Sequence, residues 1–377
     1  MTDSLKNVLK VAGSCLDDRL ISSNSLFHIS QIANLLPTIP TVSEAGFECH
    51  LGSSAPRADF LAAFTTLNNG REALINSCEP LTSLLCTNSV WSRIRNFCTH
   101  WADIKSSLYN NVGNVWLEFD VDGQPSKVPE PSLFFAPRGI RREEEKLFLS
   151  NGISGTNNWV TNEALRLLFG NFLPDEVKKQ LLTCFELLPP GGEIFQIGVM
   201  LPRKCESQAV RLCVKGIAKE QILAYLRNIG WSGSISQLSS ILSELSSFVD
   251  DIKLNFAVED TVFTKIGFEC YLDKQPEKTP RWQLFLDYLV RNQLCTLEKT
   301  NALLNWSGYS EEKFHQELWP SNFAKASAFV YPSFRSTIVR LLHHIKIVYQ
   351  PNQPLQAKAY LWFSHRWLSP SGLFKNN

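Results

Sequence analysis

The segments DIKLNFAV (251–258) and KIGFECYL (265–272) stand on either side of a short turn and together predict a β-hairpin. Apolar and polar residues alternate along both segments, as they do in strands whose side chains point in turn to the two faces of a sheet. A helical apolar pattern precedes the hairpin over residues 236–249, and a second follows it from 280 to about 305. This part of the chain therefore has the order helix, strand, strand, helix.

The same order recurs elsewhere in the chain. Further hairpins are predicted at 115–121 with 132–137, at 194–201 with 209–217, and at 344–350 with 359–365. Helical patterns are predicted at 5–20, 59–106, 141–188, 218–229, in part of 311–319, and at 334–342, with a short strand at 46–51. Short turns join strands in antiparallel pairs, which disfavours the alternating strands and helices of Rossmann and TIM-barrel folds.

Along the predicted strands, one set of alternating positions is apolar and the other carries charged, polar and aromatic side chains. The apolar set is typical of a sheet face covered by helices. The other set would face solvent in an open sheet but would line the interior of a closed barrel. Trp116, Tyr271, Tyr360 and Trp362 share this set with the charges, and such a mixture favours a ligand chamber over an exposed face.

We therefore expect an α+β fold in which repeated α-β-β-α units form an antiparallel β-barrel of about ten strands wrapped by helices. Residues 1–377 are expected to form a single barrel domain, with a helical N-terminal subregion at 1–110 as a further division. Within the C-terminal unit, His343 and His344 are expected to end the helix at 334–342, where the helix dipole favours them.

Two segments are nearly identical: GFECHL at 46–51 and GFECYL at 267–272. Each is followed by a segment with a helical pattern. The match adds modest support to the recurring unit, since a single window of six residues can also arise by coincidence.

Composition and charge exclude several classes of protein. The 37 Lys and Arg balance 36 Asp and Glu, and a net charge of +1 argues against a general nucleic-acid binder, which needs surplus cations. With 44% hydrophobic and 19% charged residues, most of the chain has ample material for a core. The 24 Phe and 10 Trp indicate either an aromatic core or a site for an apolar ligand.

No apolar run approaches the ~18 residues of a membrane-spanning helix, and no signal peptide is visible at the N-terminus. The ten cysteines are scattered without a C-x-x-C pair, so we expect reduced thiols in a cytoplasmic protein. Neither a G-x-x-x-x-G-K-[ST] nor a G-x-G-x-x-G motif occurs, which disfavours those nucleotide sites.

A recurring α-β-β-α unit with antiparallel strands, a polar lining and a wrapping of helices resembles the ABBA, or PT-barrel, prenyltransferases. The strand residues that look like this family's diphosphate-binding pattern are Arg211-x-x-x-Lys215, Lys253-x-Asn255, Lys346 and Tyr360. Glu118 or Glu269 matches the family's acidic residue that orients or deprotonates the acceptor. Tyr271, Trp116 and Trp362 complete the expected substrate-binding set.

The resemblance implies an enzyme of secondary metabolism that moves a prenyl group from an allylic diphosphate to an aromatic or peptide acceptor. Cations in a chamber shielded from water would hold the diphosphate, and aromatic faces would stabilise a developing allyl cation. Two alternatives remain: a cyclase or isomerase acting on an aromatic metabolite in the same chamber, and a non-catalytic binding module. Asp17-Asp18 and Asp250-Asp251 lack the rest of a D-D-x-x-D motif, so no metal ligands are predicted, while the use of Mg²⁺ as a cofactor stays open.

Overall fold

The computed structural model describes residues 2–76, 81–121, 128–140, 158–203, 209–330 and 333–369. Its strands are β1 (Val42–His50), β2 (Ala58–Thr65), β3 (Val112–Phe119), β4 (Ser132–Pro137), β5 (Glu193–Val199), β6 (Val210–Lys215), β7 (Asp251–Val258), β8 (Val262–Tyr271), β9 (Gly308–Glu311), β10 (Arg335–Tyr349) and β11 (Gln356–Leu368).

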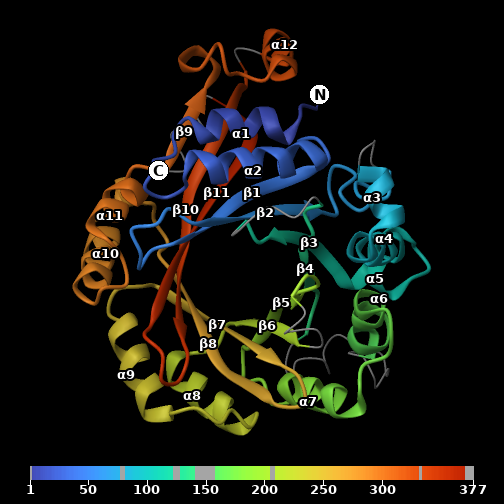
Figure 1. Ribbon diagram of the computed structural model, residues 1–377, viewed down its shortest axis with the longest axis vertical. Helices are drawn as coiled ribbons and strands as arrows, with labels where there is room; N and C mark the ends of the chain where they lie inside the picture. Colours follow the sequence, from blue (N-terminus) through green and yellow to red (C-terminus); the bar gives the residue numbers. More distant parts are fainter. Residues whose placement is uncertain are drawn as a thin grey trace.

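These strands form one antiparallel sheet in the order β11-β1-β2-β3-β4-β5-β6-β7-β8-β10-β9, and a further β10–β11 pairing closes it. The result is a closed barrel of ten strands, with β9 added to the end of β10. Figure 1 looks into this ring of strands. The expected α+β fold with an antiparallel barrel is therefore confirmed, and the open-sheet alternative is wrong.

Twelve α-helices occur among the described residues: α1 (Leu5–Gly13), α2 (Ser23–Leu35), α3 (Leu81–Thr87), α4 (Ser89–Ala102), α5 (Ser107–Asn111), α6 (Leu165–Phe169), α7 (Asp175–Glu186), α8 (Lys219–Asn228), α9 (Ile235–Leu245), α10 (Arg281–Arg291), α11 (Leu297–Leu304) and α12 (Ser321–Val330). Shorter turns of helix are η2 (Val160–Ala164), η4 (Pro276–Lys278) and η5 (Glu312–Phe314).

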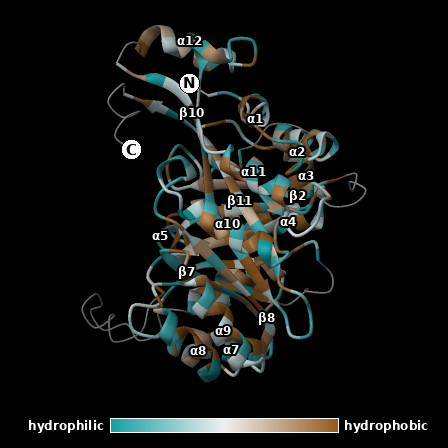
Figure 2. Cartoon of the chain, turned by 90° about the vertical axis from the view of Figure 1, so that its left-hand side faces the viewer, coloured by the Kyte–Doolittle hydropathy of each residue, from teal (hydrophilic) through white to brown (hydrophobic). Residues whose placement is uncertain are grey.

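The helices lie around the outside of the strands (Figure 1), and Figure 2 shows the side that carries α8 to α11. Helix α4 illustrates how they attach. Asn88 caps its first backbone N–H groups, and Trp91, Ile94 and Trp101 recur on one buried face. Arg95 on the opposite face is exposed. The hydrophobic core therefore lies between the helices and the outer face of the barrel.

Strand β3 shows the expected alternation. Val115, Leu117 and Phe119 are fully or almost fully buried against the helices, whereas Trp116 and Glu118 point into the barrel. The polar set of strand positions thus lines the interior. Among the described residues, no helix is long and apolar enough to span a membrane.

Two segments predicted as helices are strands. Residues 58–65 form β2, although they lie in a stretch predicted as helical, because a short run that is buried on both faces has no distinguishing period. Residues 334–342 belong mostly to β10, which begins at Arg335, and the β-branched residues Thr337, Ile338 and Val339 favour a strand there. His343 and His344 consequently lie within a strand and do not end a helix.

Of the other predicted helices, some are present in the structure and some are not. The helices predicted at 218–229 and 236–249 correspond to α8 and α9, while the region 311–319 contains the last residue of β9 and the short turn η5. Residues 141–157 of the helical segment predicted at 141–188 lie outside the described residues. The first 110 residues contain α1 to α4 and part of α5, together with strands β1 and β2 of the barrel wall.

Candidate active site

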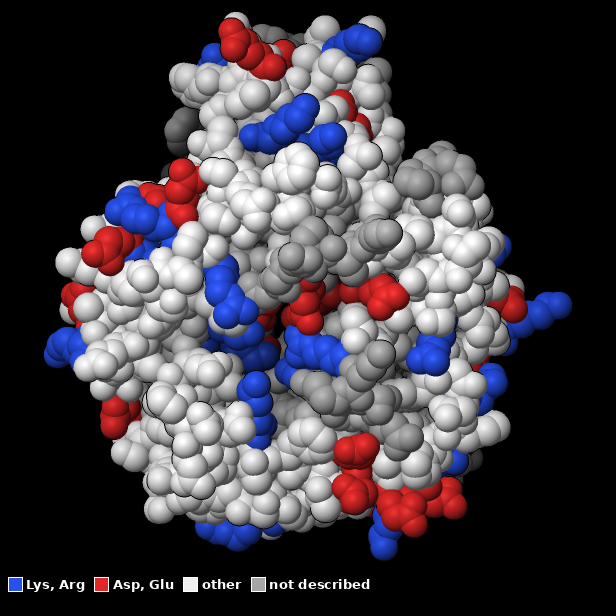
Figure 3. Space-filling view, in the orientation of Figure 1, with Lys and Arg blue, Asp and Glu red and all other residues white. Residues whose placement is uncertain are grey.

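The interior of the barrel contains two adjoining cavities, of about 260 and 370 Å³, that share five lining residues. The shared residues are Glu118, Phe134, Asn255, Lys346 and Tyr360. The two cavities are therefore lobes of one chamber. Figure 3 shows a hollow near the centre of this face of the molecule, with basic and acidic side chains around it.

The smaller lobe, which we call the cationic lobe, is lined by five basic side chains from four strands and one loop. They are Arg203, Arg211, Lys265, Lys346 and Lys358. The acidic side chains of this lobe are Glu48 and Glu118. Strands β6, β8, β10 and β11 thus direct their cations to one enclosed space, which is the arrangement that favours a small anion.

The larger lobe, which we call the aromatic lobe, has eight ring-bearing side chains in its walls. Its rings belong to Trp116, Phe134, Phe195, Tyr271, His343, His344, Tyr360 and Trp362. Lys253 lies 3.6 Å from the centre of the Tyr271 ring, a cation–π contact. Phe134 lies directly over Gly198, where a Cβ atom would come within 2.1 Å of the ring, so glycine is required for this wall.

Glu48 is held by two partners on the neighbouring strand β11. Both Lys358 and the Tyr360 hydroxyl donate hydrogen bonds to its carboxylate. Burial alone would raise the pKa of Glu48, but the positive charges of Lys358 and Lys346, with these hydrogen bonds, lower it to about 2. Glu48 is therefore an anion at neutral pH.

The pKa of Glu118, which lines both lobes, is shifted in the opposite direction. Burial raises its pKa, and the negative charges of Glu48 and Asp59 raise it further, to about 7. A carboxyl group with this pKa exchanges protons near neutral pH, as a general acid or base must. Two carboxyl groups of the chamber thus differ in protonation behaviour, with Glu48 ionised at neutral pH and Glu118 titrating near it.

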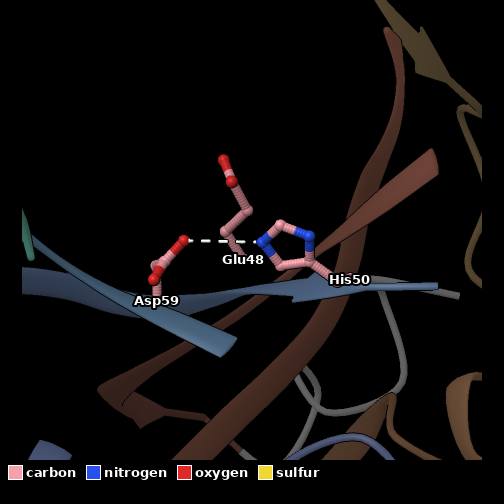
Figure 4. A group of neighbouring side chains, drawn as sticks. All are labelled: Glu48, His50 and Asp59. Carbon is pink, nitrogen blue, oxygen red and sulfur yellow. Dashed lines mark ion pairs between the residues drawn. The ribbon is translucent and has the colours of Figure 1, made fainter. Parts of the chain in front are cut away.

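Glu48, His50 and Asp59 form a group at the cationic lobe that has the donor atoms of a divalent metal site (Figure 4). Their ligand atoms all lie within 4.8 Å of one another, and His50 Nε2 is 3.8 Å from Asp59 Oδ2. The ammonium group of Lys358 already neutralises Glu48, so all three residues would fit a cation only after Lys358 moved away.

Glu269, on β8, is held by partners from β8 and β10. Tyr271 donates a hydrogen bond of 2.9 Å to its carboxylate, and Lys346 Nζ lies 3.9 Å away. Next to it, the Asn255 amide donates to the Cys213 sulfur at 2.7 Å. Glu269 is thus positioned by its neighbours in the wall of the aromatic lobe.

The structure brings together all the predicted site residues except Lys215. Glu118, Glu269, Arg211, Lys253, Asn255, Lys346, Tyr271, Tyr360, Trp116 and Trp362 line one lobe or both. Lys215 lies near the end of β6, pairs with Glu193 at 3.5 Å, and lines neither lobe. It occupies the last position of its strand, where its ammonium group lies 6.0 Å from the centre of the Phe195 ring.

Sequence reasoning missed Glu48, His50, Asp59, Lys358 and the two histidines His343 and His344. Glu48 was detectable, because it occupies the same position in GFECHL as Glu269 does in GFECYL. Asp59 was hidden by the prediction of a helix, and Lys358 stands at the edge of a predicted strand. The histidines were assigned to a helix end, which removed them from consideration.

No protein-family profile matches the chain, and no curated protein matches its sequence. Among solved structures, 5-dimethylallyltryptophan synthase from Streptomyces coelicolor aligns with a TM-score of 0.50 and 12% identity over 94% of this chain and 95% of that one. A 6-dimethylallyl tryptophan synthase gives 0.47 and 12% over 96% and 94%. AnaPT from Neosartorya fischeri gives 0.44 and 12% over 98% and 93%.

The likeness to the Streptomyces enzyme extends over nearly the whole of both chains, and at this low identity it concerns the fold. It agrees with the strand order and with the closure of the barrel described above. The chain therefore has the PT-barrel fold of the aromatic prenyltransferases.

Proposed function

We propose that this protein transfers a prenyl group from an allylic diphosphate to an aromatic or peptide acceptor. The observation that carries the proposal is the division of one barrel chamber into a cationic lobe and an aromatic lobe. A prenyl diphosphate has the same two halves, one anionic and one apolar. The Streptomyces synthase, whose name describes dimethylallylated tryptophan, supports the same reaction class through its fold.

The diphosphate would occupy the cationic lobe. Arg211 offers a planar fork of donors from β6, and Lys346 and Lys358 offer ammonium groups from β10 and β11. Such contacts gain strength in an enclosed space, because the surroundings screen charge less than bulk water does. They stabilise the negative charge that develops on the leaving diphosphate.

The transfer breaks the bond between C1 of the prenyl group and the diphosphate oxygen, and forms a bond from C1 to the acceptor. Ring faces of Tyr360 and Phe134, which line both lobes, would stabilise positive charge on the allyl group. The acceptor then loses a proton, and we assign its removal to Glu118, which also lines both lobes. If a divalent cation takes part, Glu48, His50 and Asp59 are the residues that would hold it.

Isothermal titration calorimetry with dimethylallyl and geranyl diphosphate tests this function. We expect binding of at least one of them, and R211A should weaken it roughly tenfold or more because a charge-assisted contact is lost. K215A is the matched control, since it removes a cation from the same strand but outside both lobes. K253A should weaken binding less than R211A, because Lys253 lines the aromatic lobe.

Absence of heat from both diphosphates, with the protein folded, would overturn the proposal and favour a reaction that needs no diphosphate. Equal effects of R211A and K215A would remove the diphosphate from the cationic lobe. A coupled assay for released diphosphate, run with a panel of indoles, phenols and aromatic peptides, then identifies the acceptor.

A further inference from the structure

A β-bulge in β10 places two consecutive histidines in the chamber. Leu342 pairs with Leu361 and His344 pairs with Tyr360, so His343 has no opposite residue on β11. In a regular strand, His343 and His344 would point to opposite faces, but both line the aromatic lobe. Bulges are common beside active sites, where they redirect side chains.

Both imidazole rings belong to a continuous aromatic wall. His343 stacks on Trp362 with ring centres 3.6 Å apart and planes 7° from parallel. His344 stacks between Tyr360 at 4.1 Å and Tyr271 at 4.8 Å. Each imidazole is therefore fixed in orientation by its neighbours.

The two rings are hydrogen-bonded to each other, with His343 Nδ1 and His344 Nδ1 2.7 Å apart. One of these nitrogens must carry the proton and the other accept it. Burial lowers the pKa of His344 well below its usual value, and His343, Lys346 and Lys253 lower it further. Burial and Lys253 also lower the pKa of His343, to about 3, so both rings are neutral at physiological pH.

The second ring nitrogen of His344, Nε2, has no hydrogen-bond partner among the described residues. His344 is 4% exposed, and its Nε2 atom has no hydrogen bond within the described parts of the chain. The hydroxyl groups of the flanking Tyr271 and Tyr360 donate to carboxylates instead. Since a buried polar atom without a partner costs stability, its retention in a ligand chamber points to a partner supplied by the ligand.

We propose that the aromatic lobe binds the acceptor as a planar ring whose N–H or O–H group donates a hydrogen bond to His344 Nε2. In this arrangement His344 carries its own proton on Nδ1 and donates it to His343. His344 then selects acceptors such as indoles and phenols over rings without a donor. The identification of this ring as the prenyl acceptor rests on the proposed function, whereas the hydrogen bond itself does not.

The test compares ligands in which a methyl group replaces the donor hydrogen: indole with 1-methylindole, and 1-naphthol with 1-methoxynaphthalene. Calorimetric titrations are made with the full-length protein and without any diphosphate. We expect the wild type to prefer the donor in each pair roughly tenfold, the effect of one hydrogen bond in a buried site. In H344F, which keeps a stacking ring, this preference should disappear.

H365F is the matched control, because His365 also stacks on an aromatic ring, that of Phe323 at 3.7 Å, but lies outside both lobes. It should keep the preference of the wild type. H344Q, whose amide can accept a hydrogen bond near the same place, should recover part of it. A folded H344F that still prefers the donors, or a wild type without a preference, would overturn the proposal.

If H344F does not melt cooperatively, the proposal is tested instead by NMR on the wild-type protein with ¹⁵N-labelled histidine. Indole should then shift the Nε2 resonance of one neutral histidine, and 1-methylindole should not; equal responses refute the contact. Because no diphosphate is present, these results are independent of prenyl transfer. Failure to bind dimethylallyl diphosphate would remove the proposed function and leave the ring-binding site in place.

Discussion

At the scale of single residues, the chamber separates two carboxyl groups by environment. Glu48 lies between Lys358 and Tyr360 and stays ionised, whereas Glu118 feels the negative charges of Glu48 and Asp59. Two carboxyl groups with such different pKa values can take different roles in one reaction. Glu48 is suited to holding the cations in place, and Glu118 to accepting a proton.

The variant E118Q tests this division of roles. Because the pKa of Glu118 is about 7, its carboxyl is protonated below that pH and cannot act as a base there. Wild-type activity should therefore rise as the pH passes through about 7. In E118Q, kcat should fall roughly 100-fold and this dependence should be lost. Measurements of kcat between pH 5 and 9 for the wild type and E118Q test both expectations. A pH dependence that is unchanged in E118Q would mean that another group removes the proton from the acceptor.

The variant E48Q should show its effect in stability. Glu48 has a folded-state pKa of about 2, below its ordinary 4.5, so its contribution is complete above 4.5 and is lost as the pH falls through about 2. At pH 7, E48Q should lower the free energy of unfolding by roughly 3 kcal/mol, since Lys358 loses its partner inside the barrel.

Urea unfolding at several pH values measures this difference. The gap between the wild type and E48Q should narrow as the pH is lowered from about 4.5 toward 2. E186Q, at an exposed position at the end of α7, should stay within about 0.5 kcal/mol of the wild type throughout. A gap that does not depend on pH would mean that the ion pair with Lys358 is not the cause.

At the scale of elements, the glutamates of the two GFEC segments have similar partners, which come from different strands. Both lie in barrel strands, β1 and β8, and both direct their glutamate into the chamber. Glu48 is held from β11 by Lys358 and Tyr360. Glu269 is approached by Lys346 from β10 and by Tyr271 of its own strand. The repeated residues thus form two similar sets of carboxylate, ammonium and phenol on different walls.

Their glycines should respond differently to substitution by alanine. A Cβ at Gly46 would lie 2.6 Å from the backbone oxygen of Leu361, at the seam between β1 and β11. At Gly267 it would meet the flexible end of Lys346, with Cε at 2.6 Å. G46A should therefore destabilise the fold by roughly 1–3 kcal/mol, whereas G267A should mainly weaken diphosphate binding by displacing the ammonium.

Urea unfolding and diphosphate calorimetry on both variants make this comparison. If G46A and G267A lowered the free energy of unfolding equally, the structure around Gly267 would be as unable to accommodate a Cβ atom as the structure around Gly46. An effect of G267A on neither quantity would show that Lys346 does not contribute to the cationic lobe.

At the scale of the whole molecule, a net charge of +1 conceals a local excess of cations. Five cations from distant parts of the sequence line the cationic lobe, against two carboxyl groups, those of Glu48 and Glu118. A surface for nucleic acid needs cations on the outside, but a site for a small anion needs them inside. A balanced net charge therefore disfavours a nucleic-acid-binding surface but permits a buried site for a small anion.

Binding at this lobe should stabilise the entire barrel, because its cations come from strands across the fold. Dimethylallyl diphosphate at about 100 times its Kd should add about 2.7 kcal/mol, and raise Tm by roughly 3 to 5 °C. Differential scanning fluorimetry measures the shift, with equal concentrations of sulfate as a control for ionic strength. With binding weakened tenfold, R211A should show about half of this shift at the same concentration, and a full shift in R211A would place the ligand elsewhere.

The sequence by itself determined the fold class and most of the chamber lining, because both depend on local patterns. Alternation along a strand fixes which side chains share a face, so Arg211, Lys253 and Tyr360 were assigned to one lining without knowledge of the register. Short turns fixed antiparallel pairing in the same way. The helix predicted over 334–342 was wrong because β10 takes its conformation from pairing with β9 and β11, which local spacing does not reveal.

Only the tertiary structure decided which charges meet. Glu48 and Lys358 are separated by 310 residues and become neighbours because β1 and β11 pair to close the barrel. The bulge that turns both His343 and His344 inward depends on the register of β10 against β11. Lys215 shares its strand face with Arg211, yet it stands where the strand leaves the chamber. The alternation along a strand determines on which face of the sheet a side chain lies. The pairing register and the closure of the barrel determine which residues it contacts and how deeply it is buried, and its pKa depends on both.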